Sequence, residues 1–246
     1  MSGADRTERA ILKPIARNTI NRHVATYKRL LRRHASEAAV HRFLGSHVYF
    51  FNSIARHHVP IYSKVKFGAE FEADFAFYDP SSNGAEWYFV EIEAPSQRPF
   101  TKAGRPSAKL THAIEQARDW NMWIRGNLAY SRRQFPLIQY PLFYVFMGRS
   151  EEIDDASRER IRQMNYDNRS WLEIGSLDRF TSGAESARAL GSLQLNAYSQ
   201  SDLSHGLPRS DFEWLHSGNA KDMKRFYRRW AMEERTAGRP ADFPDE

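Results

Sequence analysis

Two strand-like segments, 70–78 and 87–93, carry carboxylates where a buried strand would not normally place them. Side chains alternate between the two faces of a strand, which gives the first segment an aromatic face and an acidic face. The expected aromatic face comprises Phe71, Ala73, Phe75 and Phe77. The expected acidic face comprises Glu70, Glu72, Asp74, Ala76 and Tyr78. Turn-forming residues at 79–84 join the segments, which predicts a β-hairpin with a loose loop.

The second strand of this hairpin has an apolar face and a face that becomes acidic toward its end. The apolar face comprises Tyr88, Val90 and Ile92, and the opposite face comprises Trp87, Phe89, Glu91 and Glu93. Carboxylates gathered at one end of a hairpin repel one another unless a cation lies among them. Oxygen ligands of this kind suit Mg²⁺. The alternative is that acidic residues on an exposed edge hairpin serve only solubility.

The composition limits the classes of protein to consider. A chain of 246 residues suits one domain with extensions, and its 27% charged and 41% hydrophobic residues are typical of a soluble protein. The first residues lack the apolar core of a signal peptide, and no apolar run reaches the roughly 18 residues of a membrane span. We therefore expect a cytoplasmic protein that does not bind membranes. The absence of cysteine excludes disulfides, thiolate metal sites and cysteine nucleophiles.

Helical patterns flank the hairpin. Residues 15–35 form a basic pattern whose charged side suits either solvent or nucleic-acid phosphates, in keeping with the net charge of +6. A second helix follows at 36–44, with Glu37 in its first turn. A third is expected at 107–124, capped by Ser107.

The rest of the chain completes an α/β pattern. The apolar run 142–147 is typical of a central strand, a helix is expected at 151–164, and 171–175 is a further strand candidate. Residues 183–205 are expected to form a loop, and 211–235 a helix. We interpret the chain as an N-terminal basic helical extension, a central α/β domain and a C-terminal extension of loop and helix. Their expected bounds are 1–35, 36–182 and 183–246.

Asp74 and Glu91 lie on neighbouring antiparallel strands of the predicted hairpin, so they can converge on one cation. A metal held there would lower the pKa of a bound water and stabilise charge on a phosphoryl oxygen. That combination suits hydrolysis of a phosphodiester.

The order of these residues resembles that of the PD-(D/E)xK nucleases, which have an Asp, a Glu-x-Lys and a helix with Gln-x-x-x-Tyr. The corresponding residues here are Asp74, Glu91 to Glu93, and Gln116 to Trp120. The details are similar to the Shedu family of prokaryotic anti-phage defence proteins over roughly residues 36–180. The similar segments are Val90–Pro95, Pro99–Lys102, Gly104–Ser107 and Leu110–Gln116.

This resemblance implies a PD-(D/E)xK nuclease-like core, in which helices flank a mixed central sheet, with N- and C-terminal helical extensions. It implies a metal-dependent DNA endonuclease in anti-phage defence, with RNA left open as a substrate, and a homo-oligomer. Mg²⁺ or Mn²⁺ would be held by Asp74, Glu91 and Glu93, with Glu37 as a further ligand. Glu37 is explained equally well by its place in the first turn of its helix.

The chain departs from the nuclease signature at Glu93, where the family pattern has lysine. Glu93 could act as general base or complete the metal coordination. Lys109 or Lys102 could replace the missing lysine, and Lys109 with Gln116 would then orient the phosphate. The alternative is a catalytically inactive nucleic-acid-binding or sensor module that keeps the fold.

The segment between the hairpin and the third helix is basic. It holds Arg98, Lys102, Arg105 and Lys109 and no acidic residue, which suits contacts with DNA phosphates. The alternative is a solvated surface loop. Gln116 is equally explained as an ordinary surface glutamine, and we expect Trp120 to pack in the core rather than to stack on bases.

Overall fold

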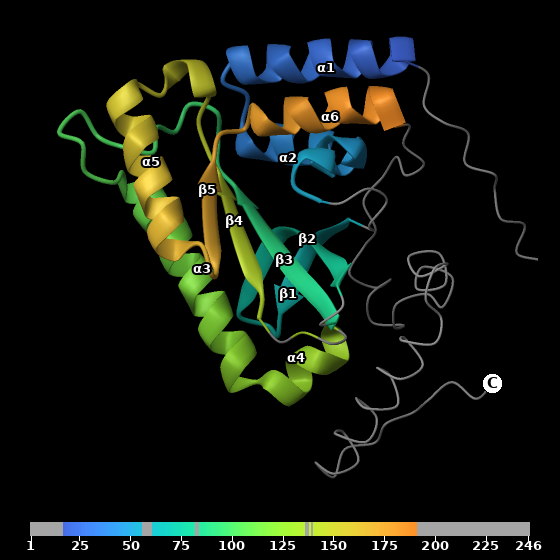
Figure 1. Ribbon diagram of the computed structural model, residues 1–246, viewed down its shortest axis with the longest axis vertical. Coiled ribbons are helices and arrows are strands. Elements are labelled where there is room, and N and C mark those ends of the chain that lie inside the picture. The colour runs from blue at the N-terminus through green and yellow to red at the C-terminus, as the bar shows by residue number, and fades with distance from the viewer. Residues whose placement is uncertain (1–16, 56–60, 82–83, 136–137, 139, 191–246) are drawn as a thin grey trace, which may run out of the picture.

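The computed structural model describes residues 17–55, 61–81, 84–135, 138 and 140–190. Its five strands are β1 (Tyr62–Phe67), β2 (Phe71–Ser81), β3 (Gly84–Ile92), β4 (Leu142–Phe146) and β5 (Leu172–Gly175). They form one sheet in sequential order, with antiparallel pairing from β1 to β3 and parallel pairing from β3 to β5. The predicted α/β class with a mixed sheet is confirmed (Figure 1).

Helices occupy the β3–β4 and β4–β5 connections and both ends of the described chain. The α-helices are α1 (Arg17–Arg32), α2 (Glu37–Gly45), α3 (Ala108–Gly126), α4 (Leu128–Gln134), α5 (Asp155–Asn168) and α6 (Arg179–Leu190). Two short 3₁₀ helices are η1 (Val48–Ser53) and η2 (Ser150–Glu152). Ser107 caps α3 as the sequence predicts, and Ser36 caps α2 in the same way, because each hydroxyl accepts a backbone N–H of the first turn.

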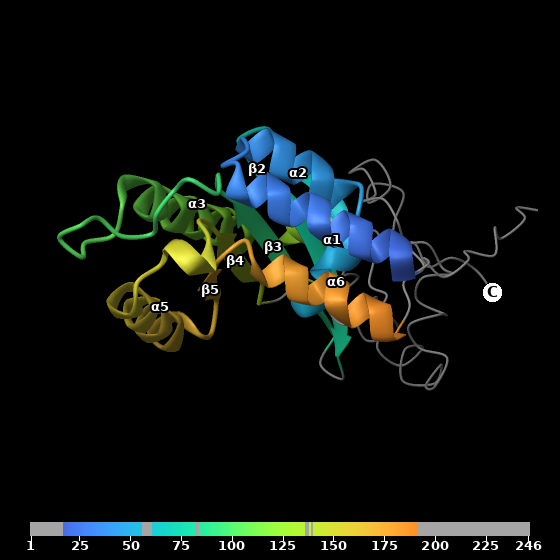
Figure 2. The same ribbon diagram turned by 90° about the horizontal axis from the view of Figure 1, so that it is seen from above.

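The sheet separates two hydrophobic cores. On one face, α3 packs on the sheet through Leu110, Ala113, Ala117, Trp120 and Ile124. Trp120 is fully buried and stacks on Phe67 with ring centroids 5.3 Å apart, so the prediction that it packs in the core is confirmed. On the other face, α1, α2, η1 and α6 cover the sheet. Seen from above, α1, α2 and α6 lie together on that side, away from α3 and α5 (Figure 2).

The loop expected from residue 183 is wrong for its first eight residues, which continue α6 to Leu190. Gly183 lies where α6 crosses η1, and a Cβ there would be 1.9 Å from the carbonyl oxygen of Phe50. The glycine therefore permits close helix packing instead of marking a loop. The helix expected at 211–235 falls outside the described residues.

The β2–β3 pairing continues to Ser81 opposite Gly84, so residues 79–81 and 84 belong to the strands and not to the loose loop expected. At the far side of the sheet, the Asn165 side chain bonds both backbone groups of Ile174 on edge strand β5. It blocks strand addition at that point, because the amide occupies the groups that another strand would use. Within the part of the chain that the structure describes, no helix is long and apolar enough to cross a membrane.

Candidate functional site

The β2–β3 hairpin brings Asp74 and Glu91 together as predicted. The last regular pair of the ladder is Phe75 with Val90, so Asp74 lies opposite Glu91. Beyond that pair, the acceptor for the next backbone N–H of β3 is a side chain. Oδ2 of Asp74 accepts a hydrogen bond from the N–H of Ile92 at 2.9 Å. Asp74 is only 4% exposed, so its carboxylate is fixed inside the sheet.

The other carboxylate oxygen of Asp74 binds a residue that the sequence analysis did not select. Nζ of Lys64 lies 2.6 Å from Oδ1 of Asp74 and 3.5 Å from Oε1 of Glu72. Burial opposes the charged form of Lys64, but its hydrogen bond to Asp74 and the nearby carboxylates outweigh burial and raise its pKa. Lys64 is therefore the counter-ion of the most buried carboxylate of the hairpin.

The expected division of β2 into one aromatic and one acidic face is wrong. Phe71 and Ala73 pack on the α3 side, whereas Phe75 and Phe77 pack on the opposite side. The switch falls at Asp74, opposite Lys64, whose backbone has a φ of +54°. The left-handed geometry of Lys64 interrupts the alternation of β1, because strict alternation requires extended backbone, and β2 changes face at the residue opposite.

Glu93 lies directly after β3, and its backbone N–H donates to Phe146 of β4. Its side chain is 5% exposed and pairs with Lys109 of α3, with Nζ 3.3 Å from Oε2. The structure thus places the predicted Lys109 beside the glutamate that stands at the lysine position of the nuclease signature.

Glu91 lies between these two ion pairs. Burial raises its pKa to about 9, and the charges of Asp74, Glu37 and Glu93 contribute to the shift. Among the described residues, Glu91 makes no side-chain hydrogen bond or ion pair. It is a partly buried carboxylate that faces other carboxylates, and its charged form requires a cation nearby.

Helix α2 contributes Glu37 and a second residue that the sequence analysis missed. Burial and the charges of Asp74 and Glu93 raise the pKa of Glu37. His41, one turn later, donates from Nε2 to the carbonyl oxygen of Asp74 at 3.2 Å and stacks on Phe75 with ring centroids 4.5 Å apart. Burial lowers the pKa of His41. Its position was signalled by the four-residue spacing from Glu37, which puts both side chains on one face of the helix.

The donor set fits a divalent cation by its chemistry. Its members are carboxylates, the ligands that Mg²⁺ prefers, and burial together with the neighbouring carboxylates raises the pKa of Glu91. Both oxygens of Asp74 are engaged by protein donors. Within the described residues, no three His, Asp or Glu side chains are close enough together to form a metal site. Cation binding would therefore require side-chain rearrangement, including a change in the partner of Asp74.

The remaining predicted residues lie apart from this cluster. The segment between β3 and α3 extends outward from the body of the molecule (Figures 1 and 2). It turns at Thr101–Arg105 and contacts Arg160 of α5 through Phe100. Arg98, Lys102 and Arg105 are exposed, and no described carboxylate of the cluster pairs with them. Gln116 is half-buried on α3, without a described side-chain bond to the cluster.

A cleft of about 460 Å³ opens beside the carboxylates, between α2 and β1. Its lining comprises Glu37, Ala38, His41, Arg42, Gly45, Ser63 and Lys64. Of these residues, Arg42 and Lys64 are cationic, and Glu37 is one of the proposed metal ligands. His41 and Lys64 contact Asp74. The cleft therefore lies next to Asp74, through the contacts of Asp74 with His41 and Lys64.

A comparison with known protein families identifies the family of this chain. The family model described as "Shedu protein SduA, C-terminal" matches residues 34–181. The chain belongs to the Shedu family. The matched region includes all five strands and every carboxylate of the cluster, whereas α1 lies before it. Membership in the Shedu family indicates a role in anti-phage defence. No curated protein matches the chain.

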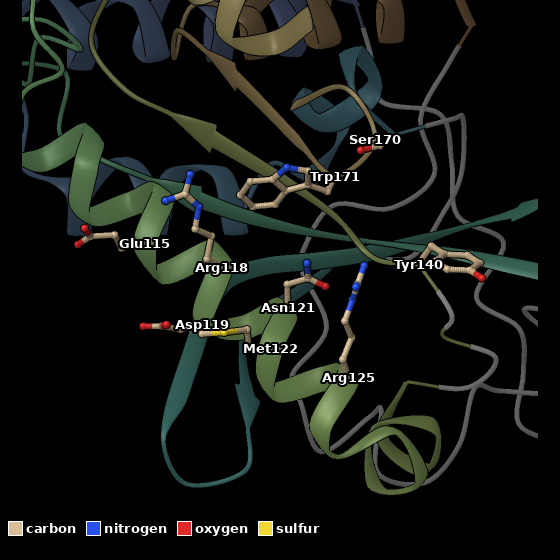
Figure 3. Close-up of a pocket in the computed structure, with 9 residues that line it drawn as sticks. All are labelled: Glu115, Arg118, Asp119, Asn121, Met122, Arg125, Tyr140, Ser170 and Trp171. Carbon is tan, nitrogen blue, oxygen red and sulfur yellow. The ribbon is translucent and has the colours of Figure 1, made fainter. Parts of the chain in front are cut away.

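The Shedu region has a second pocket, of about 620 Å³, at the opposite end of the sheet. Figure 3 shows its lining, in which Arg118 of α3 points toward Trp171 while Glu115 and Asp119 point away. The guanidinium carbon of Arg118 lies 5.9 Å from the centre of the Trp171 ring. None of the predicted site residues lines this pocket.

Proposed function

We propose that this Shedu protein is a metal-dependent endonuclease that hydrolyses DNA phosphodiester bonds in anti-phage defence. The observation that carries the proposal is the position of Asp74, Glu91 and Glu93 at the same end of a hairpin, where burial and the neighbouring carboxylates raise the pKa of Glu91 to about 9. Like charges are held together at a cost in stability, which suits a site where a cation binds. The order of strands and the helix carrying Gln116 are consistent with a PD-(D/E)xK nuclease-like core.

In this proposal Asp74 and Glu91 would hold Mg²⁺ or Mn²⁺, with Glu93 or Glu37 as a further ligand. When bound, the cation would supply a Lewis acid and a water of lowered pKa. Glu93, which is held by Lys109, accepts the proton of the attacking water or completes the coordination. Gln116 assists in orienting the phosphate, and the exposed Arg98, Lys102 and Arg105 bind the DNA backbone away from the cut.

A second candidate function is a nucleic-acid-binding or sensor module without catalysis. It is favoured by Glu93 at the lysine position and by the hydrogen bonds that both carboxylate oxygens of Asp74 make with protein donors. The two candidates differ in one measurable property, which is the breaking of the phosphodiester bond.

The test is incubation of linear, nicked and supercoiled DNA with the protein and Mg²⁺, Mn²⁺ or EDTA, beside Asp74→Asn. We expect cleavage that depends on the cation and is lost in the variant. DNA binding without cleavage under every condition would refute the nuclease and support the sensor. Cleavage of RNA alone would keep the chemistry and change the substrate.

A homo-oligomer in the cytoplasm remains part of the proposal. Gel filtration with light scattering tests it, and a strict monomer at micromolar concentration would remove it.

A further inference from the structure

Lys64 has a backbone conformation that its residue type seldom adopts. Its φ of +54° lies in the left-handed region, and it is a lysine in the middle of strand β1. Glycine or asparagine would adopt this conformation with less strain. The same position lies opposite Asp74, where the packing of both strands changes face.

The consequence of this geometry is the placement of the ammonium group. Nζ of Lys64 lies 2.6 Å from the buried Asp74, yet the lysine side chain is 49% exposed. It also lines the cleft between α2 and β1, together with Arg42 and Ser63. The ammonium therefore lies between a carboxylate of the proposed site and the opening through which a ligand would enter.

Lys109 has a different setting, although its side chain is equally exposed at 49%. It extends from regular helix α3 and pairs with Glu93 at 3.3 Å, and it does not line the cleft. Of the two lysines, Lys64 is the one that contacts both Asp74 and the open cleft.

We infer that Lys64, rather than Lys109, is the cationic residue that contacts the phosphate being cleaved. This inference rests on the proposed nuclease function. Lys64 keeps its protons and donates a hydrogen bond to a non-bridging phosphate oxygen, whose negative charge it offsets as the reaction proceeds. Arg42, at the same cleft, binds a neighbouring phosphate group.

The reaction that Lys64 assists balances as a hydrolysis. The water oxygen forms a bond to phosphorus, and the bond from phosphorus to the leaving sugar oxygen breaks. The electron pair remains on that oxygen, which takes a proton from solvent. The proton lost by the attacking water passes to the carboxylate of Glu93.

The test compares Lys64→Gly with Lys66→Gly in a DNA cleavage assay. Glycine adopts the backbone of residue 64 without strain, so Lys64→Gly removes the ammonium while it preserves the strand. Lys66 is an exposed lysine two residues further along β1 and provides the matched control. We expect cleavage to fall about 100-fold in Lys64→Gly and less than about 3-fold in Lys66→Gly.

Addition of methylammonium or ethylammonium distinguishes a chemical role from a structural one. We expect these amines to restore a measurable part of the cleavage by Lys64→Gly and to leave Lys66→Gly unchanged. A purely structural role predicts no rescue, together with a lower melting temperature in Lys64→Gly.

Cleavage by Lys64→Gly at the wild-type rate, or a loss that no amine restores, would overturn the inference and leave the nuclease intact. Absence of cleavage by the wild-type protein itself would refute the proposed function, and the role of Lys64 with it. The two failures are therefore distinguishable in one set of assays.

Discussion

The two flanks of the carboxylate cluster hold similar ion pairs in different ways. On the β1 flank, Lys64 pairs with Asp74 at 2.6 Å from a left-handed backbone, beside an open cleft. On the α3 flank, Lys109 pairs with Glu93 at 3.3 Å from a regular helix. Both lysine side chains are 49% exposed, and both carboxylate side chains are nearly buried.

The difference teaches that exposure and charge alone do not distinguish a ligand-facing cation from a supporting one. Lys64 makes a short ion pair with Asp74, has a left-handed backbone and lines the cleft. Lys109 makes the ion pair with Glu93 but has neither of the other two features. We therefore assign contact with substrate to the β1 flank and orientation of Glu93 to the α3 flank. Substitutions on the two flanks, and between them, test this division.

Removal of the carboxylates between the flanks should have the largest effect. Glu91→Gln and Asp74→Asn each remove a proposed metal ligand, so we expect cleavage to fall at least about 100-fold. The fold should persist, as circular dichroism would show. Glu115→Gln, an exposed glutamate on α3, is the control and should cleave normally. Wild-type activity in both carboxylate variants would refute the site.

Glu93→Lys tests whether the cluster is a degraded site of the nuclease type. Glu93 is nearly buried beside Lys109, so a lysine there would place two ammonium groups together. It would also remove the proposed proton acceptor. We expect cleavage to fall about 10- to 100-fold. Faster cleavage in Glu93→Lys would instead show that the site lost efficiency when it lost its lysine.

Lys109→Met should have a smaller effect on cleavage than Lys64→Gly. The ion pair with Glu93 is lost, but the glutamate keeps its place at the end of β3 through its backbone bond to Phe146. We expect a loss of no more than about 10-fold in the maximal rate. A larger loss than that of Lys64→Gly would reverse the roles assigned to the two flanks.

The metal-free protein should lose stability as pH rises, because Glu91 has a pKa of about 9 in the folded state against 4.5 ordinarily. The folded state binds this proton more tightly, so the stabilisation is complete below about pH 4.5 and is lost toward pH 9. Glu91→Gln should remove that decline. In urea denaturation with EDTA, we expect the free energy of unfolding of the variant to exceed that of the wild type by several kcal/mol at pH 9. Parallel pH profiles would contradict the assignment.

A substitution in the pocket at the other end of the sheet should have the smallest effect on cleavage and DNA affinity. Met122 is 64% exposed there and contributes to a surface distant from the carboxylates. Met122→Ser should change neither cleavage nor DNA affinity by more than about 2-fold, since exposed substitutions away from a site are close to neutral. A large loss of DNA affinity would assign that pocket to the nucleic-acid surface.

The sequence predicts the elements that carry the carboxylates better than the residues that surround them. Alternation in β3 is regular. The prediction that Trp87 and Phe89 lie on one face of the strand, and Val90 and Ile92 on the other, is confirmed. In β2 the alternation fails at Asp74, opposite the left-handed Lys64 of β1, and neither feature has a periodic signature in the sequence. A lysine in a strand gives no sign that it will contact the carboxylate opposite.

The same limit applies to contacts between distant segments. His41 reaches Asp74 across 33 residues, and its partner depends on how α2 packs on the sheet. Gly183 suggests a loop by composition, but its role is close packing of α6 on η1. The basic residues before α3 suit phosphate contacts by charge, whereas their outward position follows from the turn at Thr101–Arg105. Tertiary packing decides each of these cases.

Calorimetric titration of Mn²⁺ into the wild-type protein and Glu91→Gln tests the central claim most directly. We predict saturable binding by wild type at pH 7.5, with release of a proton from Glu91, because a ligand with a raised pKa must deprotonate to bind a cation. Titration in buffers of different ionisation enthalpy measures that proton. Binding should weaken at least about 10-fold in Glu91→Gln and release no proton. Equal binding by both proteins, or binding by neither, would contradict a cation site at this end of the hairpin.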